Sequence, residues 1–141
     1  MSDPATVQRS FRLSSRTSGL LDAAALELNE SRNALADRLL GEGVRLERHP
    51  LIRFRSDAVG RRIPHVVGTR LDVHQMIETL RANDGDVDAP ADYLALAPAL
   101  VGAALAYYAD FRDEVDTHAD AAASAARAER ERWDRERQAL A

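Results

Sequence analysis

Three aspartates alternate with other residues in the segment 84–88, which reads Asp-Gly-Asp-Val-Asp, and such a spacing could serve calcium binding. Alternating carboxylates can place several oxygen ligands around one cation, as in the loop of an EF-hand. That loop also needs glycine at its sixth position and glutamate at its twelfth, where this sequence has Ala89 and Ala95. We therefore expect no calcium site here.

The other groups that could do chemistry are scattered along the chain. The four histidines show no spacing typical of metal ligands, and there is no cysteine to complete a zinc site. Serine, histidine and aspartate occur without a nucleophile elbow, and residues 60–70 lack the lysine of a P-loop. The sequence thus predicts no metal, no cofactor and no enzymatic activity.

Composition favours a small globular protein with a thin core. The apolar residues of this 141-residue chain are mostly Ala, Leu and Val, and aromatic residues supply only 5%. The absence of cysteine fits a reducing compartment. The N-terminus does not look like a leader, and no stretch approaches the roughly 18 apolar residues of a membrane span. We expect a cytoplasmic protein without membrane contact.

Charge is distributed unevenly. Residues 1–70 contain twelve arginines and eight acidic residues, whereas residues 71–141 contain seven arginines and fifteen acidic residues, giving +4 and −8. A basic half suits nucleic acid, and an acidic half suits a basic protein surface. The two halves are predicted to face different partners.

The elements that would position functional groups begin with an alternating segment at residues 7–14. Its apolar residues Val7, Phe11 and Leu13 fall on odd positions, which is the period of a strand. Such a short strand is unstable alone and must pair with another chain or another segment. Helical spacing then predicts one helix after residues 15–18 and a second, capped by Ser31, that ends near residue 50.

This strand-helix-helix order resembles the ribbon-helix-helix family of bacterial repressors over about a third of the chain. In that family, strands from two chains pair and enter the major groove of DNA, so the resemblance implies a homodimer on double-stranded operator DNA. The base-reading positions would be Gln8, Ser10 and Arg12, whose side chains can pair with base edges. The family's phosphate contact at the second helix maps onto Ser31, Arg32 and Asn33. The alternative is a solvated edge strand followed by an ordinary helix cap.

The middle of the chain predicts a hairpin of residues 51–55 and 63–67, followed by three helices. These helices cover the apolar residues of 73–80, residues 90–96, and a segment that begins near Pro98 and contains Tyr107 and Tyr108. From about Leu51 to Asp116 the pattern is similar to a small helix-turn-helix family found in VapB-type antitoxins. Residues 98–111 contain no basic residue, so we expect dimerisation or partner binding from this unit ahead of DNA reading.

Residues 113–141 contain neither glycine nor proline and predict one long charged helix. Trp133 and Leu140 are large apolar residues on a stripe otherwise made mostly of alanine, so we expect them to bind a partner.

Together these features predict a mainly α protein with a short N-terminal β-ribbon, in three parts: residues 1–50, 51–112 and 113–141. We expect the antitoxin of a type II toxin-antitoxin system, which represses transcription as a dimer and binds a toxin. The VapB resemblance implies a PIN-fold ribonuclease as that toxin. The alternatives are a free-standing ribbon-helix-helix repressor without a toxin partner and a structural adaptor without a DNA role.

Overall fold

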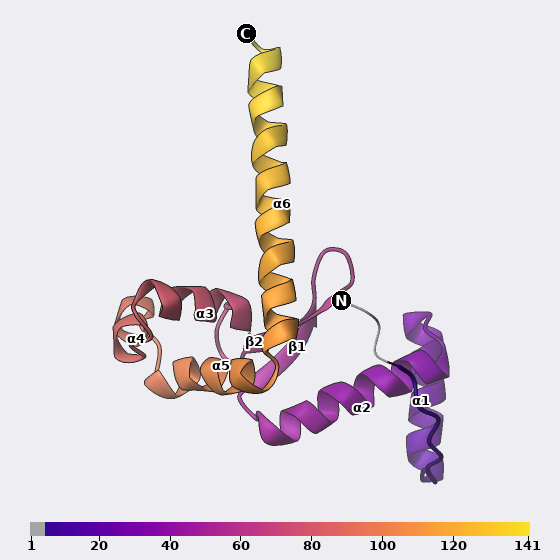
Figure 1. Ribbon diagram of the computed structural model, residues 1–141. Coiled ribbons are helices and arrows are strands. Elements are labelled where there is room, and N and C mark those ends of the chain that lie inside the picture. Colours follow the sequence, from indigo (N-terminus) through magenta and orange to yellow (C-terminus); the bar gives the residue numbers. More distant parts are fainter. Residues whose placement is uncertain (1–4) are drawn as a thin grey trace. The chain divides into compact units, whose positions relative to one another are not determined.

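The computed structural model describes residues 5–141 and is mainly helical, with one two-stranded antiparallel sheet (Figure 1). Its elements are α1 (Ser15–Leu28), α2 (Arg32–Arg48), β1 (Ile52–Ser56), β2 (Arg62–Val66), α3 (Val73–Ala82), α4 (Asp88–Leu94), α5 (Pro98–Asp110) and α6 (Arg112–Ala139). The chain forms two compact units that divide between Val44 and Arg45. This division does not coincide with the boundaries predicted near residues 50 and 112.

The first unit contains α1 and most of α2, and its helix ends follow the expected capping chemistry. Ser14 caps α1 by accepting a hydrogen bond from the backbone N–H of Thr17 at 3.1 Å. Asn29 ends α1 in the left-handed conformation, which asparagine tolerates better than most residues. Ser31 then caps α2 by accepting from the N–H of Ala34 at 3.1 Å, as its sequence position predicts.

Residues 5–14 form no strand in the single chain, contrary to the strand predicted for residues 7–14. A strand is defined by hydrogen bonds to a neighbouring strand, and this segment lies against none within its own chain. All its side chains are exposed, including those of Val7, Phe11 and Leu13. A strand at residues 7–14 would therefore need a pairing partner from outside the single chain.

The second unit begins with the predicted hairpin, displaced by one residue from its expected strands. Ile52 pairs with Val66 and Ser56 with Arg62, and residues 57–61 form the tip. At the tip, Gly60 has φ +84°, a conformation that costs glycine nothing and strains other residues. The hairpin is the only sheet in the described part of the chain.

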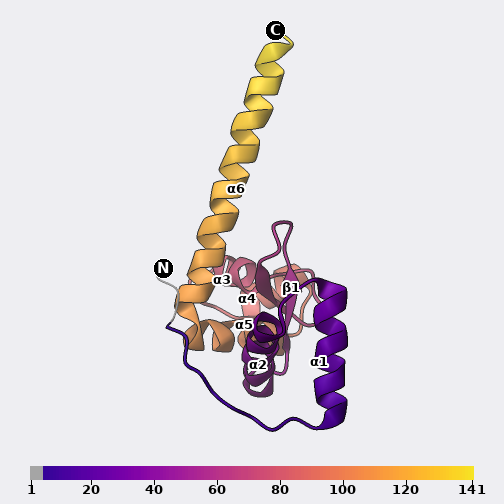
Figure 2. The same cartoon turned by 90° about the vertical axis from the view of Figure 1, so that its right-hand side faces the viewer.

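Helices α3, α5 and α6 complete the core of the second unit, and α5 packs on both strands and on α3 (Figures 1 and 2). Residues from the hairpin and from all four helices of this unit are buried together: Ile52, Val66, Val73, Met76, Ile77, Leu80, Ala91, Val101, Ala104, Tyr107, Tyr108 and Val115. The predicted helix start at Pro98 is confirmed, whereas α4 begins at Asp88, ahead of Pro90. The long C-terminal helix is also confirmed, and Val115 joins its first turns to the core.

Candidate nucleic-acid and partner interfaces

The predicted base-reading residues Gln8, Ser10 and Arg12 are all exposed. Because residues 5–14 are not in a sheet, no pleat fixes which of these side chains share a face. The structure therefore leaves them accessible without bringing them together.

The predicted phosphate contact lies at the N-terminus of α2. Ser31, Arg32 and Asn33 are exposed, and a shallow hollow beside them is lined by residues from both helices of this unit: Asp22, Ala25, Leu26, Asn29, Glu30, Ser31 and Arg32. Nη1 of Arg32 lies 3.3 Å from Oδ1 of Asp22. Both side chains are more than half exposed, and such pairs contribute little to stability, so an incoming phosphate could replace the aspartate.

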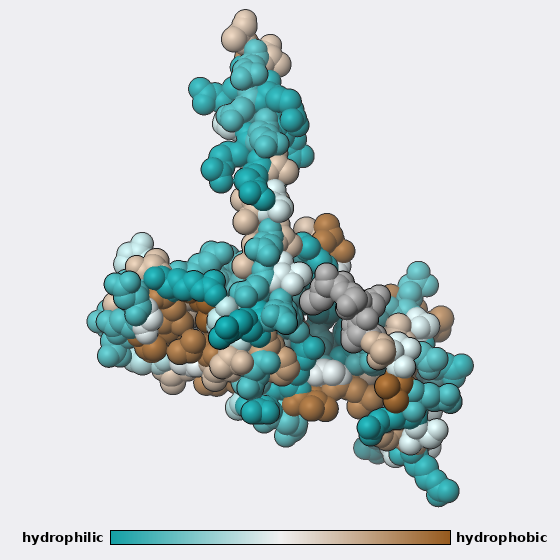
Figure 3. All heavy atoms as spheres, viewed as in Figure 1, coloured by the Kyte–Doolittle hydropathy of each residue, from teal (hydrophilic) through white to brown (hydrophobic). Residues whose placement is uncertain are grey.

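Apolar side chains of the first unit are mostly exposed. Among the described apolar residues of this unit, only Ala25 and Leu35 are buried, whereas nine large ones face solvent: Val7, Phe11, Leu13, Leu20, Leu26, Leu28, Leu39, Leu40 and Val44. Brown atoms over α2 in Figure 3 show part of this surface. In the described chain, this unit has almost no core of its own.

The covered side of α2 is charged, which the sequence pattern did not reveal. Along it lie Leu35, Arg38, Glu42 and Arg45, at spacings of three and four, and the buried His49 follows just after the end of the helix. Leu39, Leu40 and Val44 are exposed. Arg38 contacts Glu30 at 2.9 Å and Glu42 at 3.6 Å. The hydrogen bond to Glu30 raises the pKa of Arg38. In the sequence, the spacing of these charged residues by three and four positions was the feature that could have revealed the covered, charged side of α2.

Arg45 is the centre of a partly buried network in the second unit. Its guanidinium forms an ion pair with Glu114 of α6 and donates to the hydroxyl of Tyr107 at 3.2 Å. The same group lies 4.9 Å from the ring centroid of Phe111. Burial lowers the pKa of Arg45, but the interactions with Glu114 and Tyr107 together outweigh it and the net shift is upward. This network joins the end of α2 to α5 and α6.

A second polar cluster connects the hairpin to the start of α3. Arg55 donates from Nε to Oδ1 of the buried Asp72 at 2.8 Å and from Nη2 to Oδ2 at 2.5 Å. Nε2 of His74 lies 3.6 Å from Oδ2 of Asp72. The Nδ1 atoms of His74 and His118 are buried without a hydrogen-bond partner, and both residues line a hollow between the hairpin and α6. Burial lowers the pKa of His118.

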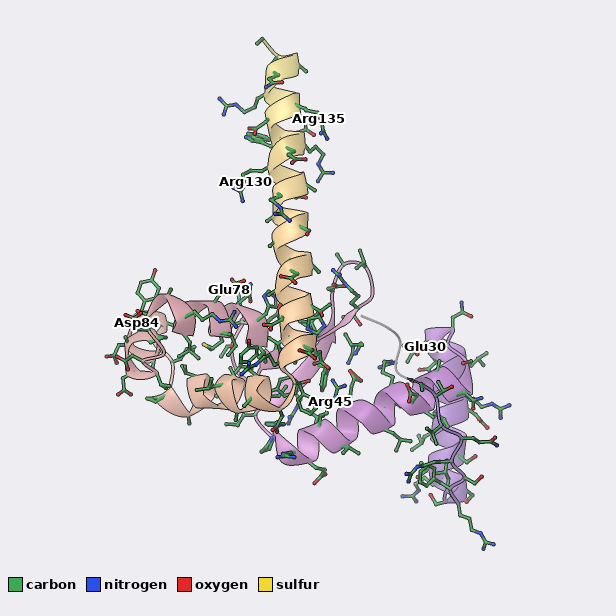
Figure 4. All side chains as sticks on the ribbon, viewed as in Figure 1. Glu30, Arg45, Glu78, Asp84, Arg130 and Arg135 are labelled. Atoms are coloured by element: carbon green, nitrogen blue, oxygen red, sulfur yellow. The ribbon has the colours of Figure 1, made fainter. Side chains whose placement is uncertain are left out.

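The distal part of α6 is entirely exposed from Glu129 onward. Trp133 is 59% exposed and Leu140 is 91% exposed, so neither packs in the single chain. Figure 4 shows Arg130 and Arg135 projecting from this part of the helix. Both predicted partner-binding residues are thus available to another molecule.

Among residues 5–141, no three histidine, cysteine, aspartate or glutamate side chains come together as metal ligands. Over the same residues, none of the helices combines the length and the apolar character needed to cross a membrane. Comparison of the chain with family models, with curated proteins and with solved structures finds no match.

Proposed function

We propose that this protein is a dimeric ribbon-helix-helix repressor that serves as the antitoxin of a type II toxin-antitoxin pair. The observation that carries the DNA-binding part is the exposed apolar surface of the first unit, combined with the alternating segment at residues 7–14. Burying a Leu, Val or Phe side chain contributes roughly 1.5–3 kcal/mol, so nine exposed ones leave this unit without its main source of stability.

A second copy of the same unit would cover the exposed apolar surface and would give residues 7–14 a strand to pair with. Two alternating segments would supply each other's hydrogen bonds as an antiparallel ribbon, with Phe11 and Leu13 on the inner face. The exposed side of α2, with Leu39, Leu40 and Val44, would pack against the other copy. Gln8, Ser10 and Arg12 would then share the outer face of the ribbon, where their side chains suit base edges.

The antitoxin part of the proposal rests on the resemblance of residues 51–116 and on the exposed end of α6. Trp133 and Leu140 are seven residues apart and therefore lie near one face of the helix, spaced by about two turns. A helix with exposed apolar anchors suits a hydrophobic groove on a partner. A ribonuclease toxin is the partner that the VapB resemblance implies.

The distribution of charge along α6 indicates which part of the helix would attract a basic toxin. Residues 113–120 contain four acidic residues and no arginine, whereas residues 127–141 contain five arginines and four acidic residues. Electrostatic attraction to a basic toxin would therefore come from the part of α6 near the core. The free end would contribute Trp133 and Leu140 as apolar anchors.

The dimer is tested by molar mass in solution and by thermal unfolding at several protein concentrations. We expect twice the chain mass and a melting temperature that rises with concentration, because dissociation accompanies unfolding. A monomer with a concentration-independent melt would contradict the ribbon-helix-helix proposal.

The antitoxin role is tested by expressing the neighbouring open reading frame with and without this protein. Growth arrest by the neighbour alone, relieved by co-expression and accompanied by a purified complex, is the expected result. Operator binding without any such neighbour would favour the free-standing repressor.

A further inference from the structure

The net positive charge of the first 70 residues lies wholly outside residues 1–50, the predicted ribbon-helix-helix part of the chain. Residues 1–50 contain seven arginines and seven acidic residues, so their net charge is zero. Residues 51–70 contain Asp57 as their only acidic residue and five arginines: Arg53, Arg55, Arg61, Arg62 and Arg70. The net charge of +4 therefore belongs to the hairpin and the loop that follows it.

Most of these arginines are presented to solvent. Arg53, Arg55, Arg61 and Arg70 are exposed. Arg55 and Arg61 are ion-paired with Asp72 and Asp57, yet their side chains remain 47% and 52% exposed. Nη1 of Arg53 donates only to neutral acceptors, the carbonyl oxygens of Pro50 at 2.9 Å and of Ile52 at 2.7 Å. Within residues 5–141, neither Arg53 nor Arg70 has an acidic partner.

The hairpin that carries these charges is held rigid at both ends. At the tip, the carboxylate of Asp57 accepts hydrogen bonds from the N–H groups of Val59 at 3.0 Å and Arg61 at 2.8 Å, and from Nε of Arg61 at 2.8 Å. Towards the core, Phe54 contacts the ring of Tyr107, with centroids 6.3 Å apart. A surface that is already ordered loses less conformational entropy on binding.

One cluster of acidic residues of the second unit lies away from the hairpin tip. Residues 84–92 contain four aspartates, and Figure 4 places Asp84 on the opposite side of α6 from the hairpin loop. Asp57 and Asp72, which do lie at the hairpin, are already neutralised by Arg61 and Arg55. The hairpin is thus a basic element within an acidic unit.

From this charge distribution we infer that the hairpin binds phosphate groups of double-stranded DNA, chiefly through Arg53 and Arg70, as a contact additional to the N-terminal ribbon. This inference rests on the proposed DNA-binding function. Exchange of neutral carbonyl acceptors for a phosphate would pair the Arg53 guanidinium with an anion, which adds a charge–charge attraction that a carbonyl oxygen does not provide. Because phosphates carry no sequence information, the hairpin supplies affinity and the ribbon supplies specificity.

The test compares full-length Arg53→Gln/Arg70→Gln with Arg130→Gln/Arg135→Gln, which removes the same charge from the exposed end of α6. Binding to a duplex from upstream of the protein's own gene, and to a shuffled duplex, is measured by fluorescence anisotropy across a salt series. The slope of log K against log salt changes by about 0.9 per phosphate contact. For each hairpin that contacts DNA, we expect the magnitude of the slope to fall by about 2 in the hairpin variant, on both duplexes. The α6 variant should keep the wild-type slope.

Including Arg12→Ala in the same titration separates this inference from the proposed function. Loss of preference for the natural duplex in Arg12→Ala, with a wild-type slope in the hairpin variant, would overturn the hairpin contact alone. A reduced slope in the hairpin variant with an unaffected Arg12→Ala would keep the hairpin and overturn the ribbon as the base reader.

Equal slope changes in the hairpin and α6 variants would also overturn the inference, because they would reflect total charge. No binding of the wild type to either duplex would overturn both proposals.

Discussion

Arg45, near the end of α2, forms an ion pair with Glu114 in the first turn of α6. The two residues are 69 positions apart in the chain, and Tyr107 of α5 donates from its hydroxyl to the same carboxylate at 2.5 Å. Burial and this hydrogen bond raise the pKa of Tyr107. The phenol therefore stays protonated and acts as a donor across the neutral pH range.

We expect Arg45→Met to lower the free energy of unfolding by roughly 1–3 kcal/mol, because it leaves Glu114 partly buried without its charged partner. Urea denaturation at a fixed protein concentration measures the change. Arg130→Met, on the exposed end of α6, is the matched control and should stay within about 0.5 kcal/mol of wild type. Equal stability of the two variants would show that the Arg45 network is not a stabilising element.

DNA binding should respond differently to two arginines of the first unit. Arg12→Ala should lose roughly 1–3 kcal/mol against the specific operator and relax base preference, because the proposed forked contact to a base edge would be removed. Arg32→Ala should weaken binding to all sequences and reduce its salt dependence. Gel shifts on operator and shuffled duplexes measure both effects, and wild-type behaviour of both variants would show that the assigned contacts are wrong.

Trp133→Ala should shorten the lifetime of the proposed toxin complex without lowering the stability of the protein alone. The side chain is largely exposed in the single chain, so its removal leaves no internal cavity. A buried aromatic anchor mainly determines the dissociation rate. Tyr93→Ala removes another exposed aromatic side chain, from α4, and is the control. A lowered melting temperature with an unchanged dissociation rate would instead indicate that Trp133 packs within the dimer.

Acidification should destabilise the second unit through His118. Burial lowers the pKa of this imidazole, with a further contribution from the neighbouring His74, so the unfolded chain takes up its proton at higher pH than the folded one. The contribution of His118 to stability is complete above its ordinary pKa of about 6.5 and is lost as pH falls through the lowered value. Denaturation curves between pH 7.5 and 5.5 should therefore show a smaller pH dependence in His118→Asn than in wild type. An identical dependence would exclude His118 as its source.

Local chemistry made much of the fold predictable. Ser31 caps α2 where the sequence places a capping residue, Pro98 begins α5, and the turn around Gly60 separates the two strands. Helix α1 begins at Ser15 with Ser14 as its cap, ahead of the predicted start after residues 15–18. These features depend on a few neighbouring residues, so a sequence pattern contains most of the required information.

Contacts between residues far apart in the sequence were much harder to predict. The Arg45–Glu114 and Arg55–Asp72 contacts involve charged residues that the sequence alone would place on solvated surfaces. The segment 7–14 shows the opposite case, because its alternating pattern predicts a strand that the single chain does not form. The basic hairpin was concealed by averaging charge over 70 residues, and only the strand boundaries separated it from a neutral N-terminal segment.

Helix α6 contains 28 residues without a break, but only its first turns pack against the core. Local opening is easiest where helical hydrogen bonds lack tertiary cover, so amide hydrogen exchange should become faster along this one helix towards its C-terminal end. Fraying from residue 139 back towards Glu129 would then proceed while the core around Val115 stays closed. A partner that binds Trp133 would stabilise the helical form of this segment. Amides several turns away from the bound tryptophan would then also exchange more slowly.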